Sequence, residues 1–378
     1  MYQKKIKESN EKKVFHYIYQ KQTNLSIADI SNDLNISFPT VKTIINKFLN
    51  ANIIKEDLKI GSGSGRKAQY YSLEKNFFYS IGISVHLNAL KIYLGNERGE
   101  VLKEIVIKDD FFKETLIEKI DDALDEFFSE INDQVKEKII GIGISIPGII
   151  DNHNNIIEIT PSIRIDLNKI KVLSKKYNLK ILIDNEANLC AITEKFLGIG
   201  KEFSSFVVLN ISSTLNMSNF KEKDFYGEFF LKASRVNHMI INFNGLLCEC
   251  GNKGCWGKYS SELSLIEEIQ KINPNIVKLK DVFKNENFEN KQIKEIFENY
   301  LDYLSIGIKN IIFMYNPEKI IISGNISQYK EFFKDELIKK IYNENIFFRG
   351  SETIVFSNLG ERSVSLGAVM LPLIDELF

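Results

Sequence analysis

The sequence predicts an α/β protein in which a small, mainly helical module at the N-terminus precedes a larger body. Three short amphipathic segments with helix-capping residues lie within residues 14–50. From Phe77 onward, strand-like apolar runs alternate with helical stretches, which is the pattern of an α/β body. A chain of 378 residues is expected to hold two or three domains and can bury its core without a disulfide framework.

The composition excludes several classes of protein. Hydrophobic residues make up 44% and charged residues 26% of the chain, so neither a disordered nor a collagen-like protein is expected. No run of about 18 apolar residues is present, and the N-terminal segment MYQKKIKESNEKK is too polar for a signal peptide. We therefore expect a cytoplasmic protein without membrane insertion.

The formal net charge of −1 hides an asymmetry between the two parts of the chain. Residues 1–75 carry 13 Lys and Arg against 7 Asp and Glu, which gives +6, and the remainder carries −7. A basic module attached to an acidic body suits a protein whose small domain approaches phosphate. A merely solvated basic face is the alternative explanation.

Three helices are predicted in the module. Apolar residues recur at helical spacing over Val14–Ile18, which indicates the first helix. Ser26–Asp29 has the form of a capping box and starts a short second helix. Ser37 caps a third helix, whose first turn tolerates Pro39 because the amide hydrogen that proline lacks has no partner there.

The third helix has two distinct faces. Its apolar face consists of Val41, Ile44, Ile45, Phe48 and Leu49. Its polar face consists of Thr40, Lys42, Thr43, Asn46 and Lys47. Short polar and cationic side chains of this kind reach base edges and phosphates in a major groove, although an ordinary solvated helix face has the same composition. We expect Thr40, Thr43 and Asn46 to read bases, and Lys42 and Lys47 to contact phosphate.

A hairpin is predicted after the third helix. Two short strands, at Ile53–Lys55 and Ala68–Leu73, flank a flexible basic tip. Three helices followed by a hairpin describe a winged helix-turn-helix, in which Arg66 and Lys67 of the wing would contact the DNA backbone or minor groove. The alternative is that Gly61–Gly65 is simply a linker.

The body reads as alternating strands and helices. Strand-like runs are YSIGISV, LKIYLG, VLKEIVIK, Ile139–Ile146 and Lys180–Asp184, and helical stretches are Phe111–Ile131, Ala187–Leu197 and Ile293–Phe313.

Several segments of the body, taken in order, resemble the ROK family of bacterial sugar kinases and transcriptional repressors. These segments are GIGISIPGIID at 141–151, DNEANLCAITEKFLGIGK at 184–201, CECGNKGCW at 248–256, PEKIIISGNIS at 317–327 and LGERSVSLGAVML at 359–371. The resemblance implies an actin-like, two-lobed body. We expect a DNA-binding domain at 1–75, a first lobe at 76–187 plus 365–378, and a second lobe with the cysteine motif at 188–364.

A metal site is predicted in the cysteine motif. Cys248, Cys250 and Cys255 lie in a glycine-turned loop, and His238 lies ten residues upstream. Three thiolates and one imidazole complete a tetrahedral zinc shell with no open position, which is typical of a structural ion. The resemblance implies zinc at the same four residues. Reduced cysteines without a metal are the alternative.

The phosphate-binding segments of the family's kinases are not preserved. Where those kinases carry Asp and Gly-Gly-Thr, this chain has Ser84–Asn88, with neither carboxylate nor glycine. The second phosphate loop is Ile211–Asn216, again without glycine, and the paired glycines near adenosine become Gly324-Asn325. We therefore expect a protein that is not an enzyme; a ROK sugar kinase with an accessory DNA-binding module is the alternative.

The sugar-binding positions implied by the resemblance are only partly preserved. Asn185 and Glu186 stand in place of the family's Asn-Asp pair, and Ser162 replaces a sugar-contacting Asn. Arg235 replaces a Glu, which favours an anionic effector such as a sugar phosphate or sugar acid over a neutral sugar. Arg235 could instead pair with an internal carboxylate, with Glu186 as the first candidate.

These observations together predict a transcriptional regulator, and specifically a repressor of carbohydrate-related genes. Its partners would be a double-stranded DNA operator, a second copy of the chain in a homodimer or tetramer, and a sugar-like effector. Control by a protein partner instead of a small molecule is a further alternative.

Overall fold

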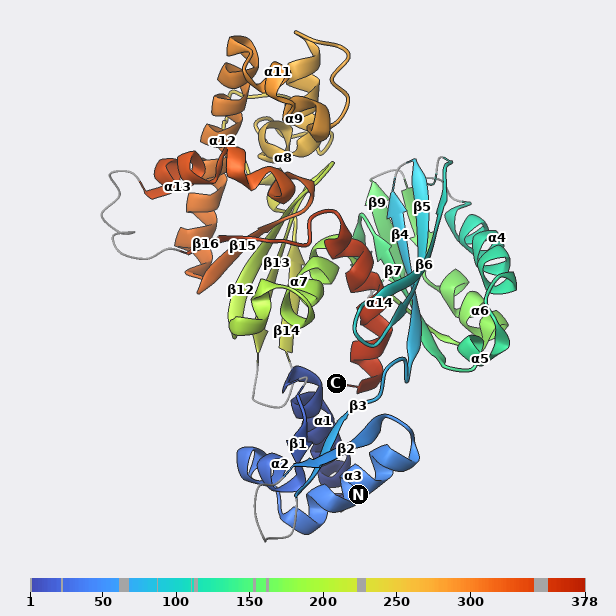
Figure 1. Cartoon of the computed structure of the whole chain (residues 1–378). Coiled ribbons are helices and arrows are strands. Elements are labelled where there is room, and N and C mark those ends of the chain that lie inside the picture. Colours follow the sequence, from blue (N-terminus) through green and yellow to red (C-terminus); the bar gives the residue numbers. More distant parts are fainter. Residues whose placement is uncertain are drawn as a thin grey trace.

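The computed structural model describes residues 2–21, 23–60, 68–86, 88–109, 111, 115–151, 154–160, 163–222, 229–342 and 353–377. Of the residues named above, Arg66, Lys67, Ser162 and the segment Gly61–Gly65 lie outside these ranges. The α/β class is confirmed: a small N-terminal module lies below a two-lobed body (Figure 1). No helix in the described ranges is both long enough and apolar enough to span a bilayer.

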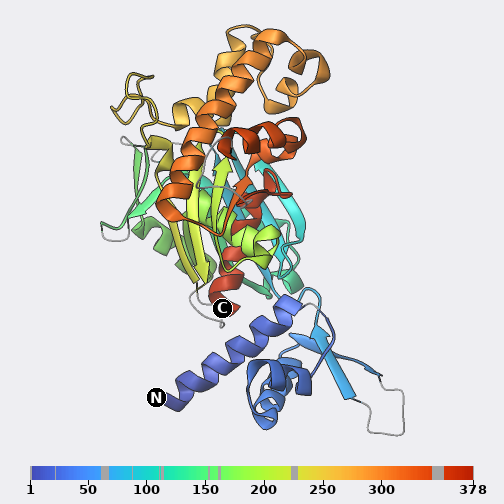
Figure 2. The ribbon, with the colours of Figure 1, turned by 90° about the vertical axis from the view of Figure 1, so that its left-hand side faces the viewer.

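The N-terminal module contains three helices and a small sheet. The elements are α1 (Tyr2–Lys21), β1 (Leu25–Ser26), α2 (Ile27–Leu34), α3 (Phe38–Asn50), β2 (Ile54–Ile60) and β3 (Ala68–Leu73), with the sheet in the order β1-β3-β2. Figure 2 shows α1 as a long helix that runs from the N-terminus up to the body, and its C-terminal end contacts β3.

The predicted helix starts in the module are confirmed. The Ser26 hydroxyl accepts a hydrogen bond from the Asp29 amide, and the Asp29 carboxylate accepts one from the Ser26 amide, which completes the capping box at α2. The Ser37 hydroxyl accepts a hydrogen bond from the Thr40 amide, and Pro39 lies in the first turn of α3. Both caps fix where the chain changes direction between the helices.

Lobe 1 is built on a five-stranded mixed sheet in the order β11-β7-β4-β5-β6. Its strands are β4 (Tyr79–His86), β5 (Ala89–Asn96), β6 (Val101–Ile107), β7 (Ile139–Ile146) and β11 (Lys180–Asn185). Beside it lie α4 (Leu116–Ser129), α5 (Asp133–Lys136), α6 (Asn168–Tyr177) and a small sheet of β8 (Ile149–Asp151), β9 (Ile156–Thr160) and β10 (Ile163–Asp166). The buried faces of α4 and of the large sheet share one hydrophobic core.

Lobe 2 is built on a second five-stranded sheet in the order β14-β13-β12-β15-β16. Its strands are β12 (Ser205–Ile211), β13 (Leu215–Glu222), β14 (Phe229–Ser234), β15 (Lys319–Ser323) and β16 (Ile354–Phe356). Its helices are α8 (Gly257–Ser260), α9 (Glu262–Gln270), α10 (Leu279–Val282), α11 (Asn285–Phe288), α12 (Lys291–Tyr315) and α13 (Lys334–Tyr342). The long helix α12 supplies the largest share of the apolar side chains that cover this sheet.

Two helices, α7 (Glu186–Phe196) and α14 (Arg362–Leu377), lie between the lobes (Figure 1). They pack on each other, and α14 also contacts β4 and β7 of lobe 1, whereas α7 contacts β12 and β13 of lobe 2. Gly143 of β7 permits the close approach of α14, because a Cβ at this position would lie 2.0 Å from the Ala368 carbonyl oxygen. The lobes therefore meet through two packed helices.

The hydrophobic core of the N-terminal module is continuous with apolar residues of the body. One continuous cluster, which we call the shared core, joins α1, α2 and α3 to the ends of α7 and α14. Its members from α1 include Val14, Phe15 and Ile18, those from α7 are Leu189, Ile192 and Phe196, and those from α14 include Leu373 and Ile374. The Tyr19 hydroxyl also donates a hydrogen bond of 2.7 Å to the Glu97 carbonyl oxygen of lobe 1.

Candidate functional site

The polar face of α3 is open to solvent. Lys42, Thr43, Asn46 and Lys47 are exposed, and Thr40 is half-buried. The Thr43 hydroxyl donates to the Pro39 carbonyl oxygen at 2.9 Å, and the Thr40 hydroxyl lies 2.8 Å from that of Ser37. The two threonines are thus held against their own helix, whereas the side chains of Lys42 and Asn46 have no hydrogen bond to another described residue.

Lys47 has an intramolecular partner that sequence reasoning missed. Its ammonium group forms an ion pair with the Glu11 carboxylate of α1, and the Lys47 side chain is 61% exposed. The Glu11 side chain is only 16% exposed, whereas the Lys47 side chain faces solvent, so a phosphate could compete with Glu11 for the ammonium group. The two residues are 36 positions apart, and no local pattern in the sequence links them.

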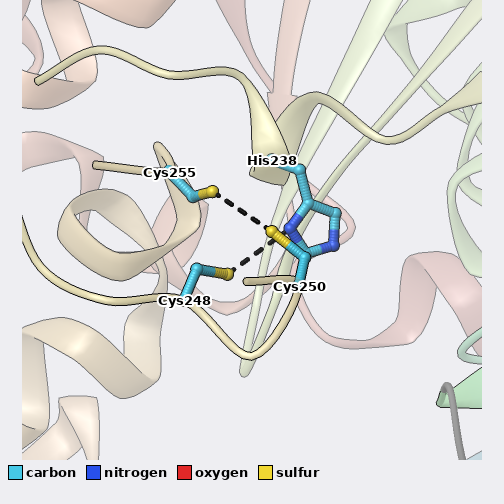
Figure 3. A group of neighbouring side chains, drawn as sticks. All are labelled: His238, Cys248, Cys250 and Cys255. Carbon is cyan, nitrogen blue, oxygen red and sulfur yellow. Dashed lines mark hydrogen bonds between the residues drawn. The ribbon is translucent and has the colours of Figure 1, made fainter. Parts of the chain in front are cut away.

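The four predicted metal ligands converge in lobe 2 (Figure 3). Their ligand atoms all lie within 4.8 Å of one another. The Cys248 sulfur is 3.5 Å from Nδ1 of His238, and the Cys250 sulfur is 3.6 Å from that of Cys255. A tetrahedral zinc ion with bonds of about 2.1–2.3 Å separates its ligands by roughly 3.5–3.8 Å, so the set fits zinc.

Backbone turns and a buried tryptophan position the metal loop. Gly251 and Gly254 adopt positive φ angles of 89° and 75°, which lets the loop fold back on itself. The next residue after the last cysteine, Trp256, is fully buried, and its indole nitrogen donates to the Tyr303 carbonyl oxygen of α12 at 3.1 Å. Gly307 makes room for this indole ring, since a Cβ there would lie 2.0 Å from it.

The protein environment alone does not favour thiolates at all three cysteines. Burial raises the pKa of Cys255 to about 12, and burial also raises the pKa of Cys248. A hydrogen bond from the backbone at Asn252 lowers the pKa of Cys250, and burial lowers the pKa of His238. A dication would stabilise all three thiolates and would accept the lone pair of a neutral imidazole.

Asn185 and Glu186 lie at the junction of β11 and α7, between the lobes. The Asn185 side chain accepts a hydrogen bond of 2.8 Å from the Ala187 amide and donates to the Gly148 carbonyl oxygen. Glu186 is 7% exposed, and its carboxylate accepts no hydrogen bond from a described residue. Burial raises the pKa of Glu186 to about 7, so removal from water outweighs the favourable field of the helix N-terminus.

Arg235 does not pair with Glu186, which corrects that interpretation of the sequence. Its guanidinium lies 3.9 Å from the Glu158 carboxylate of β9, and its side chain is 55% exposed. The pair joins lobe 2 to lobe 1. Glu158 comes from a strand whose pairing the sequence does not reveal, and Ser162 lies outside the described residues.

A buried network of hydroxyl groups between the lobes was also missed. Ser84 of β4 lies 3.4 Å from Ser365 of α14, and the Ser365 hydroxyl donates to Tyr93 at 3.0 Å. On the lobe 2 side, Ser323 lies 2.9 Å from Ser363. Single serines in a sequence do not indicate that they meet, and only the folded chain brings β4 and β15 next to the first turn of α14.

The positions of the kinase phosphate loops contain no glycine-lined cradle in the described residues. The Ser212 amide donates to the Thr214 carbonyl oxygen at 2.9 Å, which closes the β12–β13 turn on itself. Gly324 has a φ of 86°, but it packs directly on the backbone of Ile211. Asn325 donates to the Glu262 carboxylate at 2.7 Å, so its amide group is already engaged.

Comparisons with known proteins agree with this architecture. The xylose repressor of Bacillus spizizenii is 26% identical over 371 residues, which cover 96% of this chain and 94% of that protein. The glucokinase of Thermotoga maritima is 25% identical, and the match covers 77% of this chain and 96% of the kinase. A solved structure of a ROK family transcriptional regulator, a homologue of the E. coli MLC protein, has a TM-score of 0.81 at 20% identity and covers 98% of both chains.

The family assignment follows from the body of the protein. The profile of the ROK family matches residues 80–373, which leaves only the N-terminal module and a few C-terminal residues outside it. This is well over half of the chain, and we conclude that the protein belongs to the ROK family.

Proposed function

We propose that this protein is a sugar-responsive transcriptional repressor that binds operator DNA through its N-terminal module. The observation that carries the proposal is the exposed polar face of α3, located in a module that the family profile does not include. The near full-length similarity to a protein named xylose repressor supports the same function, because the glucokinase match leaves nearly a quarter of the chain uncovered.

The module would act as a winged helix-turn-helix. In this arrangement α3 enters the major groove, Asn46, Thr40 and Thr43 contact base edges, and Lys42 and Lys47 contact phosphates. Arg66 and Lys67 would extend these contacts from the tip of the hairpin. A two-fold homodimer or a tetramer would present two such helices to half-sites about 34–36 Å apart, or a multiple of that distance.

Two α3 variants test this function by separating base reading from phosphate contact. With operator fragments selected from genomic DNA, Lys47→Ala should weaken binding to all sequences alike. It should also reduce, by about 1, the slope of the logarithm of affinity against the logarithm of salt concentration. Asn46→Ala should instead relax the preference at one base position, at a cost of about 1–3 kcal/mol on the correct site. Lys175→Ala, an exposed lysine of α6 in lobe 1, is the matched control. If operator affinity is unchanged in both α3 variants, α3 is not the recognition helix.

The body would sense the effector and hold a structural zinc ion. We propose zinc at His238, Cys248, Cys250 and Cys255, because four convergent ligands leave no position for a reacting water. Asn185, Glu186, Arg235 and Ser162 are the proposed effector-binding residues, with a sugar, a sugar phosphate or a sugar acid as the ligand class. Titration of the operator complex with members of each class tests this assignment.

We further propose that the protein does not transfer phosphate. Phosphoryl transfer needs backbone amides around the phosphates and a carboxylate that holds Mg²⁺. Ser84 stands where the kinases carry a carboxylate, and the Ser212 and Asn325 positions are already engaged within the protein. The similarity to a glucokinase makes a sugar kinase the competing function. A coupled assay with ATP and a panel of hexoses would reveal it.

A further inference from the structure

A small cavity lies where the N-terminal module meets lobe 1. Its volume is about 210 Å³. The polar groups that line it are Tyr19, Asn24, Lys55, Ser72, Lys75 and Arg98. The first five belong to the N-terminal 75 residues, and Arg98 belongs to the turn between β5 and β6 of lobe 1. The cavity is therefore separate from the metal loop and from the interlobe residues.

The lining of the cavity is cationic. Three of its residues, Lys55, Lys75 and Arg98, carry positive charge, and no carboxylate belongs to the lining. In the described part of the chain, no carboxylate lies within ion-pair distance of Lys55 or Lys75. The Arg98 Nε lies 3.6 Å from a carboxylate oxygen of the fully buried Glu97, so most of the guanidinium donors remain available.

Neutral hydrogen-bonding groups complete the lining. The Ser72 hydroxyl and the Asn24 amide make no hydrogen bond to another described residue, and both can donate to an anion. The Tyr19 hydroxyl, which also lines the cavity, donates to the Glu97 carbonyl oxygen. The cavity thus combines three cations with smaller polar groups, which suits an anion that carries oxygen atoms.

The position of the cavity distinguishes it from the proposed DNA-binding surface. Lys55 pairs with Ser72 at the base of the β2–β3 hairpin, next to lobe 1. The tip of this hairpin follows Ile60, five residues further along the strand, which corresponds to about 17 Å. The cavity therefore lies at the end of β2 opposite Ile60.

We propose that this cavity binds a phosphate monoester or inorganic phosphate and that the anion links the module to lobe 1. A phosphate group carries up to two negative charges and three acceptor oxygens. It can therefore accept hydrogen bonds from the Arg98 guanidinium and from the ammonium groups of Lys55 and Lys75. The volume lies below the roughly 300–1,000 Å³ of cavities that enclose drug-sized ligands, so a small ester fits better than a nucleotide. Such a bridge would restrict the orientation of the module relative to the body.

Binding is tested on the full-length protein by calorimetry with inorganic phosphate, glycerol 1-phosphate and ribose 5-phosphate. Sodium chloride at matched ionic strength and neutral ribose serve as controls. We expect saturable binding that also raises the melting temperature. Equal affinity for all three anions would identify inorganic phosphate as the source, whereas tighter binding of an ester would identify an organic phosphate. Either result supports the proposal.

Variants locate the site. Arg98→Gln and Lys75→Gln should each weaken binding by roughly tenfold or more, because each removes a charge-assisted hydrogen bond. Lys175→Gln is the control and should bind like wild type. Arg98→Lys retains the charge and should bind better than Arg98→Gln, which guards against an effect of misfolding.

Three results would overturn the proposal. These are no saturation beyond the effect of ionic strength, unchanged affinity in both glutamine variants, and stoichiometric displacement of phosphate by duplex DNA. The last result would assign the cavity to the DNA backbone. Because none of these measurements requires an operator, the outcome is independent of the proposed repressor function.

Discussion

Replacing Glu186 with Gln should stabilise the protein, and the gain should grow with pH. Burial raises the folded-state pKa of this carboxyl from 4.5 to about 7. Between these two values the folded state binds more protons than the unfolded state, so wild type loses stability as the pH rises from 4.5 to 7. The loss amounts to about 0.4 kcal/mol at pH 4.5, about 1.4 kcal/mol at pH 5.5 and about 3 kcal/mol at pH 8. Glutamine has a similar shape and does not ionise.

Urea denaturation of wild type and Glu186→Gln at pH 4.5, 5.5, 7 and 8 measures this difference. The relevant quantity is how the difference in unfolding free energy changes with pH, because any constant offset reflects packing alone. Glu298→Gln, on the exposed side of α12, is the matched control and should follow the wild-type profile. A difference that stays constant within about 0.5 kcal/mol across this range would refute the argument that Glu186 is desolvated.

The remaining predictions concern a buried histidine and the metal loop. Burial, with Lys195 as a second cause, lowers the pKa of His16 to about 4, so wild type should lose up to about 3 kcal/mol as the pH falls from 6.5 to 4. His16→Gln should lose less unfolding free energy than wild type over this pH range, as measured by urea denaturation. An equal loss in the two proteins would argue against burial of His16. Zinc analysis should find one ion per chain in wild type and in Cys190→Ser but less in Cys250→Ser, and chelation should lower the melting temperature by about 6 °C or more. Equal metal content in both variants would exclude the proposed ligand set. Gly307→Ala should lower the free energy of unfolding by about 3 kcal/mol in thermal denaturation, because the added Cβ would overlap the Trp256 ring. An unchanged free energy of unfolding would show that the ring can move.

Features encoded by neighbouring residues could be predicted from the sequence. The capping box at Ser26 and the cap at Ser37 depend on residues three positions apart, and both are present. The cysteine motif is similarly local, and the loop needs only His238 from outside it. The sequence predicts the first helix only around Val14–Ile18, whereas α1 begins at Tyr2, because the first turns of α1 consist of polar helix formers without an apolar stripe.

Features that depend on tertiary neighbours could not be predicted. Arg235 pairs with Glu158, and Lys47 pairs with Glu11, and in both cases the partner lies on an element distant in sequence. The cationic cavity draws Arg98 from one domain and Lys55 from another, so no window of sequence contains it. Charge and periodicity identify which residues are available for pairing, but the packing of the elements determines the pairs.

The shared core limits how this protein can be recombined with its relatives. Apolar residues of α1 belong to the same hydrophobic cluster as Leu189 and Phe196 of α7 and Leu373 of α14, so a transplanted N-terminal module must match two helices of its new host. A chimera joined after residue 75 without those matched surfaces would leave apolar side chains facing water and would aggregate. If α3 is the recognition helix proposed above, exchange of operator specificity should therefore succeed more readily by replacing only the outward residues of α3 than by transplanting the whole module.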